Sequence, residues 1–341
     1  MGDSVDIDVK SGSRSYNRLD MQVSQALHMA IEIFDNVDFL LVMDYYDDIS
    51  VFDNPNNPTT VSYYQMKTSE DSISVSTIIR EEWLPKLYAH LNDSEYLIEN
   101  LGLITNCPIK LDKQLHTADK TPFLKFNNET ILKIKGDISK KLKINESDVD
   151  LSKFIHLRTT LTIAKHKDIV EHELANFLKK SYPRITVDSV KTIFQSVIDL
   201  LTKRQAYEHL PNDADFHSVR ANKGVSKEDI GTIIKMTMLI SIPEFSAIEM
   251  MAKFQENEKM LASYEYTRIL ADSQKRDDGY YFLLKKIQQE MSANPLNNNE
   301  EILDYAQRIV SNIPSNIIYS EMYKKVLVVA MLYNNWKESI T

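Results

Sequence analysis

The apolar positions of the first hundred residues follow a helical period first and the two-residue period of strands afterwards. Between residues 17 and 34 apolar side chains recur every three or four positions, which predicts a helix. These positions are Leu19, Val23, Leu27, Ala30, Ile31 and Phe34. Apolar stretches at 37–44, 47–53 and 61–67 predict three strands, and the Asn- and Pro-rich segment 54–59 predicts a turn between the last two.

A second helix and a fourth strand complete this pattern. Residues 69–91 predict a helix that contains Pro85, and residues 96–106 predict a strand. The predicted order is therefore helix, three strands, helix and strand. This order is typical of an α/β (α+β) fold in which a mixed sheet is flanked by helices.

The remainder of the chain predicts mainly helices. Residues 108–150 are rich in lysine and irregular, so we expect a loop with short elements there. Helical periodicity prevails from residue 165 onwards, which predicts an all-helical C-terminal region. We expect a core with a lysine-rich extension at 1–150, a helical completion of that domain at 151–244, and a helical interaction domain at 245–341.

The composition is that of an ordinary globular protein. Apolar residues make up 43 % of the chain, and the single cysteine, Cys107, excludes an internal disulfide framework. The first ten residues are acidic and contain no apolar stretch, so they do not predict a secretory signal. The apolar run at 326–332 is too short to span a bilayer. We therefore expect a cytoplasmic protein without a membrane partner.

The net charge of −9 is unevenly distributed along the chain. Residues 1–107 hold 18 acidic and 6 basic residues, whereas 110–143 hold nine lysines and four acidic residues. Many lysine-rich segments serve only solvation. The functional alternative is contact with DNA phosphates, and the candidates for such contact are Lys133, Lys135, Lys140 and Lys141.

The second and third predicted strands bring together residues that suit metal-dependent chemistry. Side chains alternate along a strand, so Gln65 and Lys67 share one face. If Asp53 pairs with Thr60 across the turn, Asp48 lies opposite Gln65, and the paired side chains are about 5 Å apart. Carboxylate and amide oxygens are ligands for a hard cation such as Mg²⁺, with Mn²⁺ as the alternative. Lys67 can hold the attacking water or offset negative charge on a phosphate.

Four segments together carry a resemblance to a known family: SRSYNRLDMQVSQALHMAI, YYDDISVFD, YYQMKTS and LGLITNCPI. In this order and spacing the chain resembles the double-strand DNA endonuclease domain of bacterial anti-phage effectors, which has the PD-(D/E)xK nuclease fold. The resemblance covers residues 10–110 well and continues as a vaguer helical similarity to about residue 240. It implies a metal-dependent endonuclease that cuts double-stranded DNA.

The resemblance also implies which residues carry the reaction. The catalytic acid, glutamine and lysine of the family fall on Asp48, Gln65 and Lys67, and the glutamine of its first helix falls on Gln22. Before Gln22 this chain has RLDM where the family often has a Gly-Phe pair. Asp47 is adjacent to the acid, and we expect it to assist Asp48 and Gln65 in holding the metal.

The same resemblance implies protein partners. The domain is fused to a cyclic-oligonucleotide sensor in CBASS systems and is the nuclease subunit beside an SMC-like ATPase in Lamassu-type systems. The last hundred residues predict helices and no such sensor, which favours a subunit that a partner or homo-oligomerisation activates. We expect a Lamassu-type complex with an SMC-like ATPase and an accessory defence subunit. The alternatives are a HerA-like ATPase as the partner, or a non-enzymatic assembly protein with a degenerate nuclease core.

Overall fold

The computed structural model divides the chain into two compact units. It describes residues 11–111, 114–183, 185–240, 242–275, 278–314 and 318–336. The first unit holds the residues up to 180 together with 186–233, and the second holds 181–185 together with the residues from 234 onwards. Each unit has a hydrophobic core of its own.

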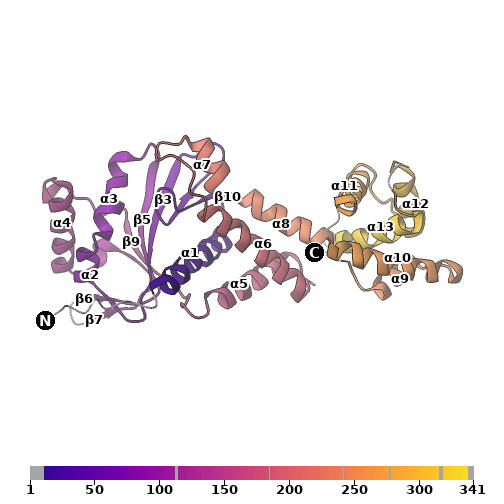
Figure 1. Ribbon diagram of the computed structural model, residues 1–341, viewed down its shortest axis with the longest axis horizontal. Coiled ribbons are helices and arrows are strands. Elements are labelled where there is room, and N and C mark those ends of the chain that lie inside the picture. The colour runs from indigo at the N-terminus through magenta and orange to yellow at the C-terminus, as the bar shows by residue number, and fades with distance from the viewer. Residues whose placement is uncertain are drawn as a thin grey trace, which may run out of the picture. The chain divides into compact units, whose positions relative to one another are not determined.

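A seven-stranded mixed sheet forms the centre of the first unit, with the strand order β10-β1-β2-β3-β5-β9-β8 (Figure 1). The strands are β1 (Leu40–Met43), β2 (Ile49–Phe52), β3 (Thr60–Lys67), β5 (Leu97–Thr105), β8 (Lys120–Pro122), β9 (Phe154–Arg158) and β10 (Gly224–Ser226). β3, β5 and β9 are parallel to one another, and the other neighbouring pairs are antiparallel. A small second sheet has the order β4 (Ile73–Ser74), β6 (Ile109–Leu111) and β7 (Gln114–His116).

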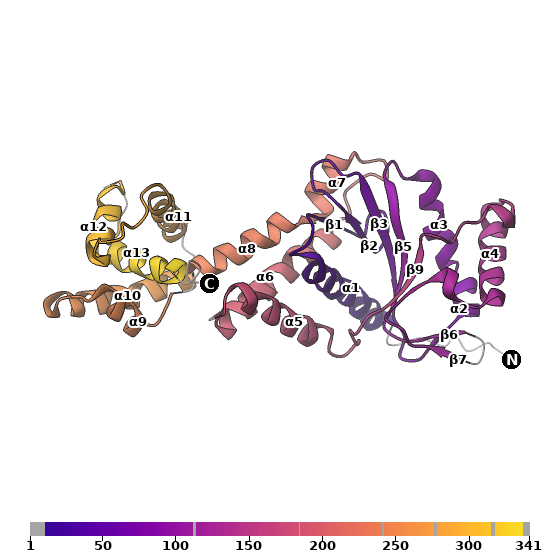
Figure 2. The same ribbon diagram turned by 180° about the vertical axis from the view of Figure 1, so that it is seen from behind.

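Helices cover both faces of the large sheet, as the two opposite views in Figures 1 and 2 show. The helices up to residue 240 are α1 (Ser11–Ile33), α2 (Val75–Arg80), α3 (Trp83–Asp93), α4 (Asn128–Leu142), α5 (His166–Ser181), α6 (Val187–Gln205), α7 (Phe216–Lys223) and α8 (Lys227–Ile240), of which α8 leads away from the sheet into the second unit. α1 and α6 lie on one face and α3 on the other, with α4 packed outside α3. The fold class predicted from the sequence, a mixed α/β core followed by a helical C-terminal region, is confirmed.

The register of the β2–β3 hairpin is the one predicted from the turn. Ile49 pairs with Tyr64, and the Asp53 N–H donates to the Thr60 carbonyl oxygen at 3.3 Å. Asp48 directly precedes the paired residues, and its Oδ2 atom accepts the Met66 N–H at 2.6 Å, so the carboxylate lies beside the end of β3. Strand alternation puts Gln65 and Lys67 on the face of Tyr63, which meets α3 through His90 and Trp83, and puts Tyr64 on the opposite face.

Close packing between β3 and β5 requires a glycine. Gly102 pairs with Tyr64 in the parallel ladder, and a Cβ atom at this position would lie 2.2 Å from the Cδ1 atom of the Tyr64 ring. That distance is far inside van der Waals contact. The Tyr64 ring therefore lies over the backbone of β5 only because residue 102 has no side chain.

Three sequence expectations need correction. The segment 69–91, expected to be one helix, contains β4, α2 and α3, and the break between α2 and α3 falls at Glu82, which adopts a left-handed conformation with φ 56°. Pro85 lies in the first turn of α3, where the missing N–H has no helical partner to lose. The segment 108–150 is less irregular than expected, since it contains the 15-residue helix α4. Two strands of the large sheet, β9 and β10, come from residues for which only helices were predicted.

The second unit consists of helices in the part of the chain that the structure describes. They are α9 (Phe245–Ala252), α10 (Glu256–Lys275), α11 (Asp278–Ala293), α12 (Ile302–Ser311) and α13 (Glu321–Trp336). α13 is the central helix, and α9, α10, α11 and α12 all pack against it. Consecutive residues from Val326 to Leu332 are therefore buried, so the several apolar faces of α13 find their partners within this unit.

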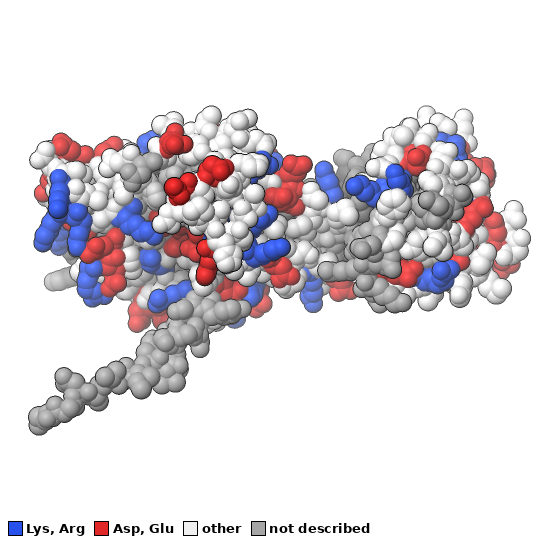
Figure 3. Space-filling model, turned by 45° about the horizontal axis from the view of Figure 1, so that its top comes forward, with Lys and Arg blue, Asp and Glu red and all other residues white. Residues whose placement is uncertain are grey.

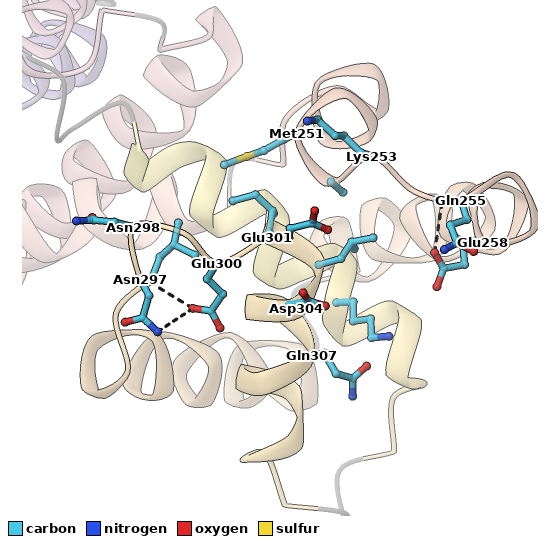
Figure 4. A pocket seen from close by; sticks show the side chains of 15 residues that line it. Met251, Lys253, Gln255, Glu258, Asn297, Asn298, Glu300, Glu301, Asp304 and Gln307 are labelled. Carbon is cyan, nitrogen blue, oxygen red and sulfur yellow. Dashed lines mark hydrogen bonds between the residues drawn. The ribbon is translucent and has the colours of Figure 1, made fainter.

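A cavity of about 660 Å³ opens beside α9, α10 and α12 in the second unit (Figure 4). Its lining includes Glu258, Glu301 and Asp304 together with Lys253. The carboxylate of Glu300, also at its edge, is bound by the Arg308 guanidinium at 2.6 Å. In neither unit is a described helix long and apolar enough to cross a membrane.

Candidate active site at the ends of β2 and β3

Asp48 lies directly before β2, and its carboxylate reaches the end of β3. Its Oδ2 atom accepts the backbone N–H of Met66 at 2.6 Å. Burial raises the pKa of the Asp48 carboxyl, and the nearby Lys67 ammonium and the Met66 N–H act against this rise. The carboxylate is therefore held in one orientation beside Gln65 and Lys67.

Lys67 is the last residue of β3 and is half-buried. Burial lowers the pKa of its ammonium, while the charges of Asp48 and Asp47 raise it. The Nζ atom lies 5.4 Å from the centroid of the Trp83 ring, over its face. A cation in this position gains from the negative face of the indole, so Trp83 fixes the Lys67 side chain next to Asp48.

Gln65 supplies an unpaired oxygen at the same place. Its side chain is only 4 % exposed, and its Oε1 atom has no hydrogen-bond partner among the described residues. A buried polar atom left in this way costs about 1–3 kcal/mol. A cation held between Gln65 Oε1 and the Asp48 carboxylate would satisfy this oxygen, so these two residues fit the predicted metal.

Asp47 faces α3 and is fully occupied by contacts within the protein. Its Oδ1 atom accepts the N–H of Asp48 at 3.0 Å, and its Oδ2 atom accepts from His90 Nε2 at 3.3 Å. The Lys86 ammonium lies 3.7 Å from Oδ1. Within the described ranges no group of three or more His, Cys, Asp or Glu side chains is arranged to hold a metal. In the structure the Asp47 carboxylate accepts the backbone N–H of Asp48 and so holds that residue in place. The role of Asp47 as a metal ligand stays a prediction.

Comparison with known proteins shows the family of this chain. The family model described as "Cap4, dsDNA endonuclease domain" matches residues 10–205, which is more than half of the chain and includes α1 to α6 and β1 to β9. The chain belongs to the Cap4 dsDNA endonuclease domain family.

A named relative matches most of the chain. The Lamassu protein LmuA of Bacillus cereus (strain VD014) is 27 % identical over 301 residues, which cover 87 % of this chain and 81 % of that protein. Because 301 residues exceed the first unit, this likeness extends into the second unit.

Two solved Cap4 structures are also similar. The Cap4 SAVED/CARF-domain containing receptor of Moraxella osloensis matches with a TM-score of 0.41 and 14 % identity, over 65 % of this chain and 47 % of that one. The receptor of Acinetobacter baumannii with the cyclic trinucleotide 2'3'3'-cAAA matches with a TM-score of 0.38 and 12 % identity, over 64 % of this chain and 44 % of that one. The chain therefore spans less than half the length of each of these two receptors.

In this Cap4 domain the predicted Gln22 is hydrogen-bonded to α6 and, among the described residues, not to the other predicted site residues. It belongs to α1, on the opposite face of the sheet from α3, and its Oε1 atom accepts from Gln205 Nε2 of α6 at 2.8 Å. As far as the chain is described, Gln22 makes no hydrogen bond to Asp48, Gln65 or Lys67. The structure thus unites three of the predicted catalytic residues and ties the fourth to α6.

The predicted DNA-binding lysines all belong to α4. Figure 3 shows Lys and Arg side chains gathered at the left of the view, where α4 lies in Figure 1. Lys133 pairs with Glu129 at 2.7 Å, Lys141 pairs with Glu82, Lys140 is exposed and Lys135 is half-buried. Glu82 directly precedes Trp83, so the Lys141–Glu82 ion pair brings the end of α4 beside the start of α3. The Trp83 ring at that start is the one that Lys67 contacts.

One face of α3, which was not predicted from the sequence as part of the site, contacts the site residues. Trp83, Lys86 and His90 are spaced by three and four residues, which places them on one side of a helix. Trp83 contacts Lys67, whereas Lys86 and His90 contact Asp47, and the His90 ring also stacks on Tyr63 with the centroids 4.0 Å apart. The helical spacing was visible in the sequence, but only the fold shows that this face meets the site.

Proposed function

We propose that this Cap4-family chain is a metal-dependent DNA endonuclease that works as the nuclease subunit of a Lamassu-type anti-phage defence complex. The observation that carries the proposal is the buried, unpaired Gln65 oxygen beside the Asp48 carboxylate and the Lys67 ammonium. The relative named as the Lamassu protein LmuA supports the choice of system.

In this proposal Asp48 and Gln65 hold the metal, and Lys67 acts on the substrate. Mg²⁺ or Mn²⁺, when bound, supplies Lewis acidity and a more acidic water. The N–H of Met66 keeps the Asp48 carboxylate in place. The Lys67 ammonium, held over Trp83, offsets the negative charge that develops on the phosphate under attack. Water is the attacking group, and the broken bond is the phosphodiester bond.

The charge of residues 1–107 supports control by a partner. Residues 1–107 carry a balance of −12, and a surface of this sign repels the DNA backbone. The lysines of α4 supply some of the missing positive charge. We propose that an SMC-like ATPase with an accessory subunit, or oligomerisation on DNA, supplies the rest and activates cutting. A HerA-like ATPase is the alternative partner.

The second unit is the proposed docking region for that partner. α10 exposes Met260, Leu261 and Tyr264, with Met260 81 % exposed. Residues 260 and 264 lie on the same side of the helix because they are four positions apart. Exposed apolar side chains that gather in this way are typical of protein–protein contacts.

A plasmid-nicking assay tests the nuclease proposal. Supercoiled plasmid is incubated with the chain and its ATPase partner in Mg²⁺, in Mn²⁺ and in EDTA. We expect cleavage in either metal, none in EDTA, and none by Asp48→Asn, whereas the exposed Asp35→Asn should cut like the wild type. Cutting that survives EDTA, or that Asp48→Asn retains, would contradict the mechanism.

Calorimetric titration with Mn²⁺ separates the roles of the two adjacent acids. Asp48→Asn removes a proposed ligand and should abolish metal binding. Asp47→Asn keeps an oxygen that can accept the Asp48 N–H, so a positioning Asp47 predicts binding weakened by less than about tenfold, the effect of roughly one hydrogen bond. Loss of Mn²⁺ binding in both variants would instead make Asp47 a ligand.

A further inference from the structure

Lys223 is a buried cation that the proposed chemistry does not use. It is the last residue of α7 and only 4 % exposed. Its Nζ atom donates to two backbone carbonyl oxygens, that of Asp44 at 3.1 Å and that of Gln205 at 2.9 Å. A buried ammonium is costly unless its hydrogen bonds are made, so such a lysine persists where it holds something in place.

One of the two carbonyl groups belongs to the turn that carries the catalytic acid. Asp44 follows β1 and has φ 47°, a left-handed conformation that a residue with a side chain seldom adopts. Its N–H donates to the carbonyl oxygen of Asp48 at 3.2 Å, so residues 44–48 form a closed turn. Lys223 holds this turn at the opposite end from Asp48.

The other carbonyl group ends α6. Gln205 is the last residue of that helix, where carbonyl groups lack helical partners and the helix dipole favours a cation. The Gln205 side chain also donates to Gln22 of α1. Through Gln205, Lys223 therefore joins the 44–48 turn to α6 and α1, and Gln22 becomes part of the same set of contacts.

The backbone next to Lys223 is fixed against the sheet. Gly224 pairs with Val42 of β1, and a Cβ atom at residue 224 would lie 2.5 Å from the Arg220 carbonyl oxygen and 2.9 Å from Leu40 Cδ1. The backbone that carries Lys223 is therefore closely packed next to β1, and from this position the Lys223 ammonium reaches the Asp44 carbonyl oxygen.

We propose that Lys223 is a positioning residue of the active site, which holds the 44–48 turn so that Asp48 meets the Met66 N–H and Gln65. The inference rests on the proposed nuclease function for its consequence, since it acts through Asp48. Whether Lys223 restrains the 44–48 turn can be measured without any cleavage assay.

Hydrogen–deuterium exchange of the full-length chain tests the hold directly. Lys223→Met removes the donor at nearly constant side-chain length, and Lys203→Met, at an exposed lysine in the last turn of α6, is the matched control. Because hydrogen bonds from a charged donor are lost, we expect peptides covering residues 44–49 and Met66 to exchange roughly ten- to a hundredfold faster in Lys223→Met. The control should match the wild type, and peptides from α4 should not change in either protein.

Metal dependence gives the second readout. In Lys223→Met we expect the Mg²⁺ concentration for half-maximal cleavage to rise about tenfold, with a smaller fall in rate at saturating Mg²⁺. Lys223→Arg keeps the charge and the donors and should restore most of the wild-type response. A merely structural role would lower stability without changing the metal requirement.

Three results would overturn the inference. They are unchanged exchange at 44–49, equally faster exchange throughout the first unit, and an unchanged Mg²⁺ requirement. If Lys223→Met shows no cooperative unfolding and is therefore not folded, Lys223→Gln replaces it in both experiments. This variant keeps a hydrogen-bond donor without the charge, and the same results are expected. A wild-type chain that never cuts DNA would refute the nuclease proposal, whereas the exchange result would still decide whether Lys223 holds the turn.

Discussion

The Oδ2 atom of Asp48 accepts the N–H of Met66, which belongs to β3 between Gln65 and Lys67. The carboxylate that precedes one strand is thus fixed by the backbone of the neighbouring strand. Because Gln65 and Lys67 flank that N–H, the same contact sets the distance from the acid to both of them. Changes that disturb β3 should therefore affect chemistry as well as stability.

Trp83 should influence the rate of cleavage without influencing DNA binding. Trp83→Leu removes the aromatic face below Lys67, and a cation–π contact of about 1–2 kcal/mol corresponds to a roughly five- to thirtyfold lower kcat. Trp83→Phe keeps an aromatic face and should lose less. Single-turnover cleavage and a separate DNA-binding titration measure the two effects, and an equal loss in both would contradict the role given to Trp83.

Glu82 and Lys141 allow a test of the α4 surface in both directions. Glu82→Gln frees Lys141 from its ion pair, so DNA affinity should increase, whereas Lys141→Glu should lower it. Each lost phosphate contact reduces the slope of log affinity against log salt by about 0.9. Charge reversal at Lys133, Lys135 and Lys140 should act in the same direction as Lys141→Glu. Identical salt slopes in all variants would leave α4 with a role in solvation only.

Gly102 and Gly231 make a matched pair for stability. Gly102→Ala forces a Cβ atom into the Tyr64 ring and should destabilise the first unit by about 1–3 kcal/mol. Gly231 lies in α8 with open space around it, so Gly231→Ala should be neutral or stabilise by about 0.5–1 kcal/mol. Urea denaturation measures both. Combining Gly102→Ala with Tyr64→Leu should cost less than the sum of the single changes, because the clash is removed.

His156 should make the first unit sensitive to acid. Its imidazole is fully buried, and Nε2 is hydrogen-bonded to Thr105 Oγ1 at 2.8 Å. Burial lowers the pKa of His156 from 6.5 to about 4, so the unfolded chain binds a proton between these values that the folded chain does not. Stability should therefore rise with pH from about 4 to 6.5, by about 3 kcal/mol at most.

Unfolding by urea at several pH values measures this dependence. His156→Gln should flatten it over the same range, and the exposed His172→Gln should leave it unchanged. A wild-type stability that does not fall between pH 6.5 and 4 would contradict the assignment.

Removal of α13 should unfold the second unit and leave the first intact. Tyr323, Val326 and Val329 of this helix are fully buried in the core of the second unit. A chain that ends at residue 320 should show one cooperative transition in calorimetry where the whole chain shows two. The shortened chain should keep any basal metal-dependent cutting of DNA, but its control by the partner should be lost. A single transition in both proteins would argue against two independent cores.

The sequence was sufficient for the hairpin that carries the site because two local signals agree there. Strand alternation selected the face of Gln65 and Lys67, and the turn length selected the partner of Gln65. Both signals act within about twenty residues, which is the range over which periodicity is informative. The helix that became α1, apart from its first turns at 11–16, and the helical nature of α13 followed from the same kind of pattern.

The remaining features depend on contacts between distant segments. β10 has three residues, too few for alternation to distinguish a strand from a loop, and both β10 and β9 are defined by their neighbours in the sheet. Lys223 and Asp44 are 179 residues apart, and no local pattern relates them. The occupied carboxylate of Asp47 is likewise a consequence of where α3 packs.

The strand β10 forms a short ladder with β1 at the edge of the sheet. Its ladder with β1 contains three residue pairs, and one further bond, from the Lys227 N–H to the Phe39 carbonyl oxygen, extends it. The chain runs from β10 directly into α8 and on to the second unit. A mechanical load on α8 therefore falls on a few backbone bonds immediately after Lys223. Opening the β10–β1 ladder would withdraw Lys223 from the 44–48 turn, so a pull at this one point would loosen the turn that carries Asp48 without any contact to Asp48.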